Sequence, residues 1–303
     1  ALSNLSAGVG RPSAGSDIYF DGDPSSWTQA AWTLKARFYM HIKDYEQAYA
    51  AAQKGIQSPQ YSLLSPHGTA NGGANLNYQF VAIAVRQADV IVSDFFTSLL
   101  SADPAVNPNI AAYRGNAKTD ETARFNFLFR LTGLGVQPNI VDGYAAQTAP
   151  GAIVTYQENQ LILAEAGLRS NGFEAGLQHL NNFRSFMASG GYLLNSGNAG
   201  LKYDPYLGAD FESGGMENVD GISAENALLR EILEERYVTL FGQIEGFNDV
   251  RRTLQESQVR VPVLPNTGDQ LPQRYLYPAT EIERNTNTPA VIPGFFEPTA
   301  VNQ

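Results

Sequence analysis

The 303-residue sequence has no cysteine, no cluster of basic residues and no long apolar run. The absence of cysteine excludes disulfides, thiolate metal sites and cysteine nucleophiles. Lys and Arg total 20 against 30 Asp and Glu, a net charge of −10, which argues against nucleic acid as a partner because phosphate binding needs a basic face. No segment approaches the roughly 20 apolar residues that a membrane-spanning helix requires.

Motifs for catalysis, metals and cofactors are also missing. The three histidines, His41, His67 and His179, form no spaced ligand pair, and no phosphate-binding loop or nucleophile elbow is present. The aspartates of residues 17–23 lack the spacing of a calcium loop and predict a turn instead. We therefore expect no metal and no cofactor.

A pair of glycosidase carboxylates could come from Glu234, Glu235 and Glu245. Neighbouring carboxylates on a helix point apart, however, and Glu235 is expected to pair with Arg236 or with the arginines at 251–252. The sequence therefore predicts a protein that is not an enzyme.

Apolar periodicity predicts a helical hairpin over residues 156–186. The expected buried positions recur at helical spacing in both halves: Leu161, Ala164, Leu168, Phe173, Leu177, Leu180 and Phe183. Between the halves, Ser170–Gly172 supplies residues that tolerate the left-handed conformation at a helix end.

A second hairpin is predicted over residues 27–56, with Ser25 or Ser26 as its N-cap. Its expected buried stripes are Trp27, Ala31, Leu34, Phe38 and Ile42, followed by Tyr45, Ala48 and Ala52. The aromatic-x-x-small pattern after a short turn is typical of tetratricopeptide-like helix pairs.

A third helical unit is expected at about 223–254. Ser223 is its predicted cap, and Gly242 is expected to interrupt it. The predicted core positions are Leu229, Leu233, Tyr237 and Leu240. The tail over 259–303 is rich in Pro and Asn, and we expect it to pack over the helices irregularly.

Long segments separate these units: a loop at 57–80, a helix near 90–100, and loop insertions at 101–150 and 190–221. Residues 125–131 are a candidate short strand. Loops of this length in a compact fold are more often functional than idle.

Aromatic, amide and guanidinium side chains in these loops suit the recognition of sugars, which stack C–H groups on aromatic faces and accept hydrogen bonds. The candidate ligand-binding residues are Tyr78, Tyr113, Arg114, Asn139 and Tyr144. Tyr203 and Tyr206 form a second, lower-ranked patch. For any single tyrosine the alternative is that it merely covers the core.

Four segments, in this order, resemble the SusD/RagB family of nutrient-binding outer-membrane lipoproteins. They are Ser16–Trp27, Glu158–Arg184, Glu235–Arg252 and Arg274–Pro278, the last followed by Glu281 and Asn285. The segment Phe241–Phe247 differs from the sequence that is more common in the family at this place, and it is similar to a divergent subgroup.

The resemblance implies a mainly α, SusD-like scaffold of tetratricopeptide-like helix pairs with long irregular ligand-binding loops. It further implies a cell-surface protein of the outer membrane, lipid-anchored in its full-length precursor, that binds an oligosaccharide and delivers it to a SusC-like TonB-dependent transporter. Family chains usually carry an upstream portion with a lipid-bearing cysteine. We expect this chain to lack that portion and to form a single domain over 1–303.

Two alternatives to glycan binding stay open. One is a peptide-binding member of the same family. The other is a helical-repeat adaptor for another protein, although concave helix faces would serve an adaptor without such long aromatic-bearing loops.

Overall fold

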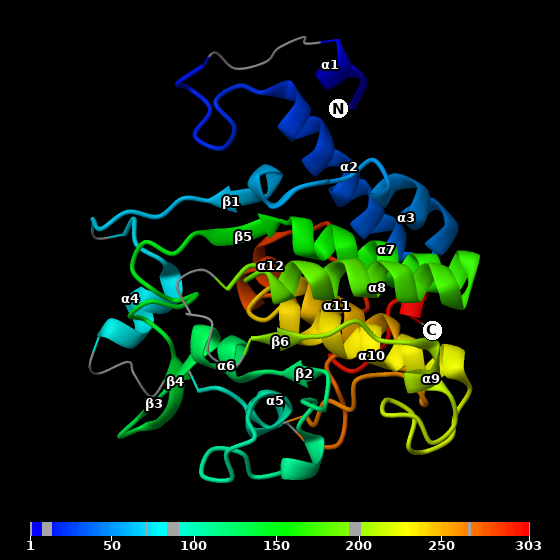
Figure 1. The fold of residues 1–303 in the computed structure, drawn as a ribbon. Coiled ribbons are helices and arrows are strands. Elements are labelled where there is room, and N and C mark those ends of the chain that lie inside the picture. The colour runs from blue at the N-terminus through cyan, green and yellow to red at the C-terminus, as the bar shows by residue number, and fades with distance from the viewer. Residues whose placement is uncertain are drawn as a thin grey trace.

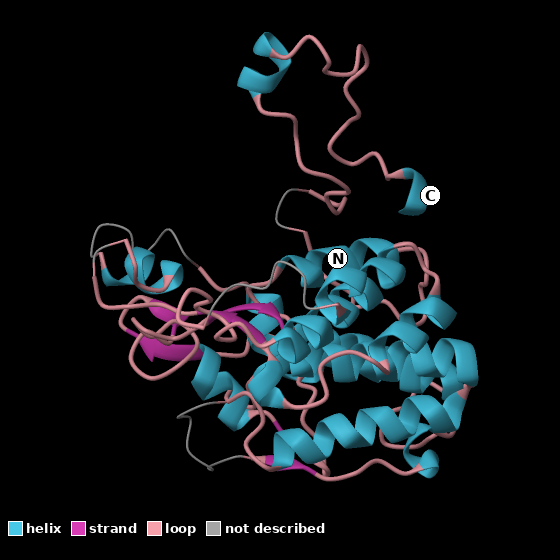
Figure 2. Ribbon diagram, turned by 90° about the horizontal axis from the view of Figure 1, so that it is seen from above, coloured by secondary structure: helices cyan, strands magenta, loops and turns pink. Residues whose placement is uncertain are grey.

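The computed structural model describes residues 2–7, 14–70, 72–83, 91–193, 201–265 and 268–302. Within them the fold is mainly α, with short two-stranded sheets beside the helices (Figures 1 and 2). None of the described helices is long and apolar enough to cross a lipid bilayer.

The elements follow one another as α1 Leu2–Ser6, α2 Pro24–His41, α3 Tyr45–Ala52, η1 Pro59–Tyr61, β1 Leu63–Ser65, α4 Leu76–Ala82, α5 Asp94–Leu100, η3 Ile110–Ala112, β2 Thr119–Asp120, α6 Thr122–Leu128, β3 Phe129–Thr132, β4 Gly135–Pro138, β5 Gly151–Val154, α7 Tyr156–Asn171, α8 Phe173–Ala188, β6 Lys202–Tyr203, α9 Gly208–Phe211, α10 Ala224–Thr239, α11 Ile244–Arg252, α12 Ala279–Arg284 and η4 Ala300–Asn302. The sheets pair β1 with β5, β2 with β6 and β3 with β4, all antiparallel.

The predicted hairpin over 156–186 is the centre of the fold, formed by α7 and α8. Thr155 caps α7 by accepting a hydrogen bond from the Glu158 amide, and Gly172 ends the helix at a φ of 89°. Helix α7 packs against α2, α3, α8 and α10, so its central part, Glu158–Leu168, is buried.

Helices α2 and α3 form the second predicted hairpin, but the predicted buried stripe of α2 is wrong. Phe38 and Ile42 are each 56% exposed, while Ala30, Thr33 and Ala36 face the interior. The small side chains allow close approach to α7, where the Thr33 hydroxyl donates to Asn159 Oδ1 at 3.0 Å. Periodicity located the helix, whereas close packing and a buried polar contact selected its inner face.

The cap of α2 also differs from prediction. Asp23, not Ser25 or Ser26, is the N-cap, and its carboxylate accepts from both serine amides. The preceding turn is held by Asp17, which accepts from the indole Nε1 of Trp27 at 2.6 Å.

Helices α10 and α11 form the third predicted unit. Ser223 caps α10, and Gly242, with a φ of 72°, separates the two helices, so both signals are confirmed. The buried side of α10 packs against α7 and α8 around Ile232 and Leu233.

The insertion at 101–150 contains more structure than its sequence suggests. The expected strand at 125–131 is mostly wrong, because the chain is helical to Leu128 and becomes extended only from Phe129. The expected helix near 90–100 is α5, Asp94–Leu100; residues 84–90 lie outside the described part.

Two further expectations need correction. Tyr203 and Tyr206, the lower-ranked surface patch, are each 2% exposed, because Tyr206 stacks under the Arg184 guanidinium and Tyr203 lies on β6 in the core. The tail over 259–303 covers the helices only in part: Val259 and Val261 are buried in the core cluster with residues of α7, α8 and α10. Figure 2 shows the segment that leads to the C-terminus extending away from most of the body, although η4 lies next to α11. Tyr275 contacts Phe247, but most tail side chains are exposed, because the segment offers no continuous apolar face.

Candidate functional site

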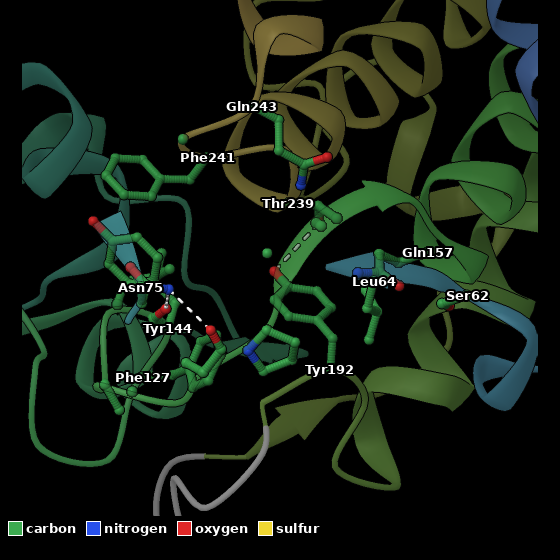
Figure 3. Close-up of a pocket in the computed structure, with 18 of the residues that line it drawn as sticks. Ser62, Leu64, Asn75, Phe127, Tyr144, Gln157, Tyr192, Thr239, Phe241 and Gln243 are labelled. Carbon is green, nitrogen blue, oxygen red and sulfur yellow. Dashed lines mark hydrogen bonds between the residues drawn. The ribbon is translucent and has the colours of Figure 1, made fainter. Parts of the chain in front are cut away.

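A pocket of about 640 Å³ opens where several separate parts of the chain meet. They are η1 and β1, the start of α4, the end of α6, the loop 142–152 that leads into β5, the start of α7, the end of α8 and the connection between α10 and α11. In Figure 3, Tyr144, Phe127 and Phe241 lie on one side, Ser62, Leu64 and Gln157 on the other, with Tyr192, Thr239 and Gln243 between them. A concave site of this size with aromatic and polar lining is typical of small-ligand binding.

Aromatic rings form one wall of the pocket. Tyr144 meets Phe241 edge to face, with 5.4 Å between ring centroids, and Phe127 meets Tyr192 at 6.2 Å. Phe241 is fixed from behind by Phe96, whose ring centroid lies 4.5 Å away. The wall is therefore supported by the core and offers an apolar surface for stacking.

Asn75 holds two sides of the pocket together. Its Nδ2 donates to the carbonyl oxygens of Tyr144 at 3.1 Å and Ala149 at 3.0 Å, while its Oδ1 caps α4 by accepting from the amides of Asn77 and Tyr78. Because this amide is fully used and buried, its role is to position the loops.

Three other amide side chains lining the pocket have no hydrogen-bond partner within the described part of the chain. They belong to Asn77, Gln157 and Gln243. Each amide has two N–H donors and one oxygen acceptor, a complement to sugar hydroxyls, which both donate and accept.

The tyrosine hydroxyls add neutral donors. Burial raises the pKa of both Tyr144 and Tyr192, so both stay protonated over the physiological range. Tyr192 donates to Thr239 Oγ1 at 3.5 Å, and Thr239 in turn donates to Glu235 at 2.9 Å.

Of the five candidate ligand-binding residues predicted from the sequence, only Tyr144 lines this pocket. Asn139 is 4% exposed and lies behind the wall, where its Nδ2 donates to the Asn126 carbonyl at 2.7 Å and to Asp142 at 2.8 Å. Tyr78 is half-buried on α4, next to the lining residue Asn77 but outside the lining.

Tyr113 and Arg114 lie away from the pocket. Arg114 is 8% exposed, and its guanidinium pairs with Glu121, with Glu231 at 2.9 Å and with Glu235 at 3.0 Å. The half-buried Tyr113 accepts a hydrogen bond from the Glu121 amide at 3.4 Å. The structure therefore does not bring this pair together with Tyr144.

The expected partners of Glu235 are also wrong. Its carboxylate pairs with Arg124 at 2.7 Å and with Arg114, rather than with Arg236 or the arginines at 251–252. Although burial raises the pKa of Glu235, the charges of Arg124 and Arg114 lower it to about 2. This carboxylate is therefore a structural anion that neutralises two buried arginines.

Phe241, Gln243, Gln157 and Tyr192 are pocket residues that the sequence did not identify. For Phe241 and Gln243 one signal was available, since the segment Phe241–Phe247 differs around Gly242 from the sequence that is common in the family. Among the described residues, no group of three or more His, Asp or Glu side chains is arranged to hold a metal ion.

A protein-family model described as "Starch-binding associating with outer membrane", SusD-like, matches residues 2–278. The search of curated proteins found no match.

Solved structures show the same fold. A SusD/RagB family protein of Bacteroides thetaiotaomicron matches with a TM-score of 0.59 and 19% identity, covering 94% of this chain and 65% of its own. A chitin-binding protein matches with a TM-score of 0.57 and 21% identity over 94% and 64%, and a chitin-binding SusD homolog of Flavobacterium johnsoniae with 0.54 and 16% over 93% and 63%. The chain thus spans somewhat less than two thirds of the length of these structures, and the predicted mainly α fold is confirmed.

Proposed function

Since this chain belongs to the SusD-like family of starch-binding proteins that associate with the outer membrane, we propose that it binds an oligosaccharide in the pocket containing Tyr144 and Phe241. Proteins of this family bind substrates without catalysis, and the chain is accordingly not an enzyme.

The observation that carries the proposal is the combination of a supported aromatic wall with unpaired amides around one cavity. The Tyr144–Phe241 pair offers faces and edges to sugar C–H groups, and Gln157 and Gln243 offer donors and acceptors from other segments. Two proteins with this fold are described as chitin-binding, which adds support for a glycan over a peptide.

The cellular setting of the proposal rests on family membership. We propose a surface-exposed protein of the outer membrane, lipid-anchored in its full-length precursor, that delivers its ligand to a SusC-like TonB-dependent transporter. The family description, with its outer-membrane association, supports the location.

A glycan-array screen of the purified chain, followed by titration calorimetry with the best ligand, tests the pocket. We expect Tyr144→Ala and Phe241→Ala each to weaken binding about two- to twelvefold, since an aromatic contact is worth ~0.5–1.5 kcal/mol. Tyr277→Ala, in the exposed tail, is the matched control and should bind like the parent chain.

Tyr113→Ala tests the other location indicated by the sequence. A loss of affinity in Tyr113→Ala but not in Tyr144→Ala would move the site to the region of Tyr113. Binding of peptides but no glycan by a folded sample would favour the peptide-binding alternative.

A further inference from the structure

The pocket is almost free of charge. Among the described residues that line it, Asp142 is the single acidic side chain, and no Lys, Arg or His is present. Its polar groups are otherwise amides, hydroxyls and backbone, including the neutral Tyr144 and Tyr192.

The buried cations that are connected to the pocket through Glu235 are already neutralised. Thr239 connects the pocket to Glu235, and Glu235 holds Arg124 and Arg114 below the floor. Arg124 has no exposed surface, and its charge is shared between Glu235 and Glu121. Neither Arg124 nor Arg114 can therefore turn toward a ligand without breaking buried ion pairs, which is strongly unfavourable.

The charge that is present is negative and lies at the rim. Asp142 is exposed, and its Oδ1 accepts from Asn139 Nδ2 at 2.8 Å, which fixes the carboxylate in place. A ligand anion would approach this carboxylate on a chain of net charge −10 and would lose water without gaining a cationic partner.

From this arrangement we infer that the pocket selects uncharged oligosaccharides and rejects acidic ones, such as those bearing uronates or sulfates. The inference rests on the proposed function and names the substrate class of the same site. Specificity against acidic glycans here comes from an unfavourable element, the Asp142 carboxylate, and from the lack of a compensating cation among the described residues of the lining.

The test compares pairs of ligands that differ only at their primary hydroxyl positions, which are neutral in one member and carboxylates in the other. Each neutral oligosaccharide found on the array is titrated beside the same oligosaccharide with its primary hydroxyls oxidised to carboxylates. At low salt we expect the neutral member to bind roughly tenfold more tightly than the oxidised one, which is the effect of one nearby like charge that solvent partly screens. At high salt the ratio of the two affinities should be smaller, because added ions screen the repulsion further.

Two variants address the rim charge directly. Asp142→Asn keeps the side-chain shape and should reduce the ratio of the affinity for the neutral member to the affinity for the oxidised member. Asp142→Lys should reduce this affinity ratio further or invert it. Glu212→Gln changes the net charge by the same amount as Asp142→Asn, at an exposed position outside the pocket lining, and should leave the affinity ratio as in the parent chain.

Equal or tighter binding of the oxidised member by the parent chain would overturn this inference while leaving glycan binding intact. An unchanged ratio in Asp142→Lys would overturn it as well. Failure of a folded sample to bind either member would instead overturn the proposed function, and with it this inference.

Discussion

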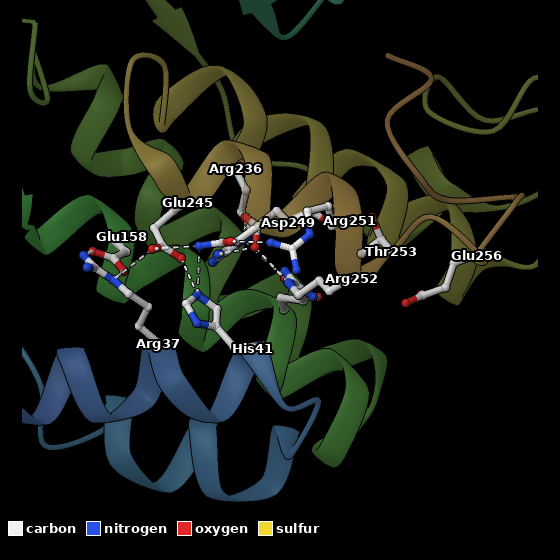
Figure 4. Close-up of polar contacts among 12 residues, drawn as sticks. Arg37, His41, Glu158, Arg236, Glu245, Asp249, Arg251, Arg252, Thr253 and Glu256 are labelled. Atoms are coloured by element: carbon white, nitrogen blue, oxygen red, sulfur yellow. Dashed lines mark hydrogen bonds and ion pairs between the residues drawn. The ribbon is translucent and has the colours of Figure 1, made fainter. Parts of the chain in front are cut away.

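Arg252 on α11 forms a bidentate ion pair with Glu165 on α7, with both nitrogen–oxygen distances at 2.5 Å. Asp249 receives further hydrogen bonds from Arg252 and Arg236, each at 2.8 Å. Figure 4 shows this group continuing to Glu245, which lies 2.6 Å from His41 on α2. The second and third predicted helical units are thus joined to the first through one buried ionic layer.

Loss of Arg252 should be costly. In Arg252→Met the Glu165 carboxylate stays fully buried but loses its bidentate partner, and we expect a loss of about 3–5 kcal/mol in the free energy of unfolding. Urea denaturation measures the change. Arg230→Met is the matched control, because the Arg230–Asp220 pair is solvent-accessible and should be worth ~1 kcal/mol or less. Equal losses in the two variants would contradict the structural role of the ionic layer.

Acid should weaken the same layer. Burial raises the pKa of Glu165, but the charges of Arg252 and Arg169 outweigh it and lower the value to about 2, against 4.5 for the free side chain. A lowered folded-state pKa stabilises the protein above pH ~4.5, and the contribution is lost as pH falls toward about 2. Melting temperatures between pH 7 and pH 2 check this.

The comparison that isolates Glu165 is Glu165→Gln. This variant should start from a lower melting temperature at pH 7 and lose less on acidification, because it lacks the titrating group. Parallel curves for parent and variant would show that Glu165 does not contribute to the acid response.

Gly55 lies where side chains of α2 and α7 approach its backbone too closely to leave room for a larger residue. A Cβ at this position would collide with Asn159 Oδ1 and Thr33 Oγ1, the two atoms joined by the hydrogen bond between α7 and α2. We expect Gly55→Ala to cost about 1–3 kcal/mol, the usual range for overpacking, as measured by thermal denaturation. Gly68→Ala, where an added Cβ meets nothing within 4 Å, should be close to neutral. An unchanged melting temperature in Gly55→Ala would mean that α2 and α7 can move apart at this point without loss of stability.

The helical units should unfold together, as predicted for a single domain over 1–303. Helix α7 contacts helices of the second and third units, and the buried ion pairs cross between units. Calorimetry should therefore show one transition whose calorimetric and van't Hoff enthalpies agree. Two resolved transitions would instead divide the chain into separate domains.

Local signals in the sequence predicted the helical framework well. Gly172 and Ser223 mark a helix end and a helix start because their roles depend on the backbone of a few neighbouring residues. The inner face of α2 was predicted wrongly because Phe38 and Ile42 are more apolar than the alanines that actually pack. The choice between the two faces depends on how closely α7 approaches, which no local pattern specifies.

By itself the sequence determined the helix pairs, the family and the absence of catalytic and metal motifs, all of which depend on composition or short spacings. Tertiary structure alone decided the pocket, where Leu64, Tyr144, Tyr192 and Phe241 converge from distant segments. It also decided that Arg114 is bound by buried carboxylates, including Glu231 on α10, instead of facing a ligand. Ion pairs and cavities form between residues far apart in the chain, so their partners become defined only once the helices have packed.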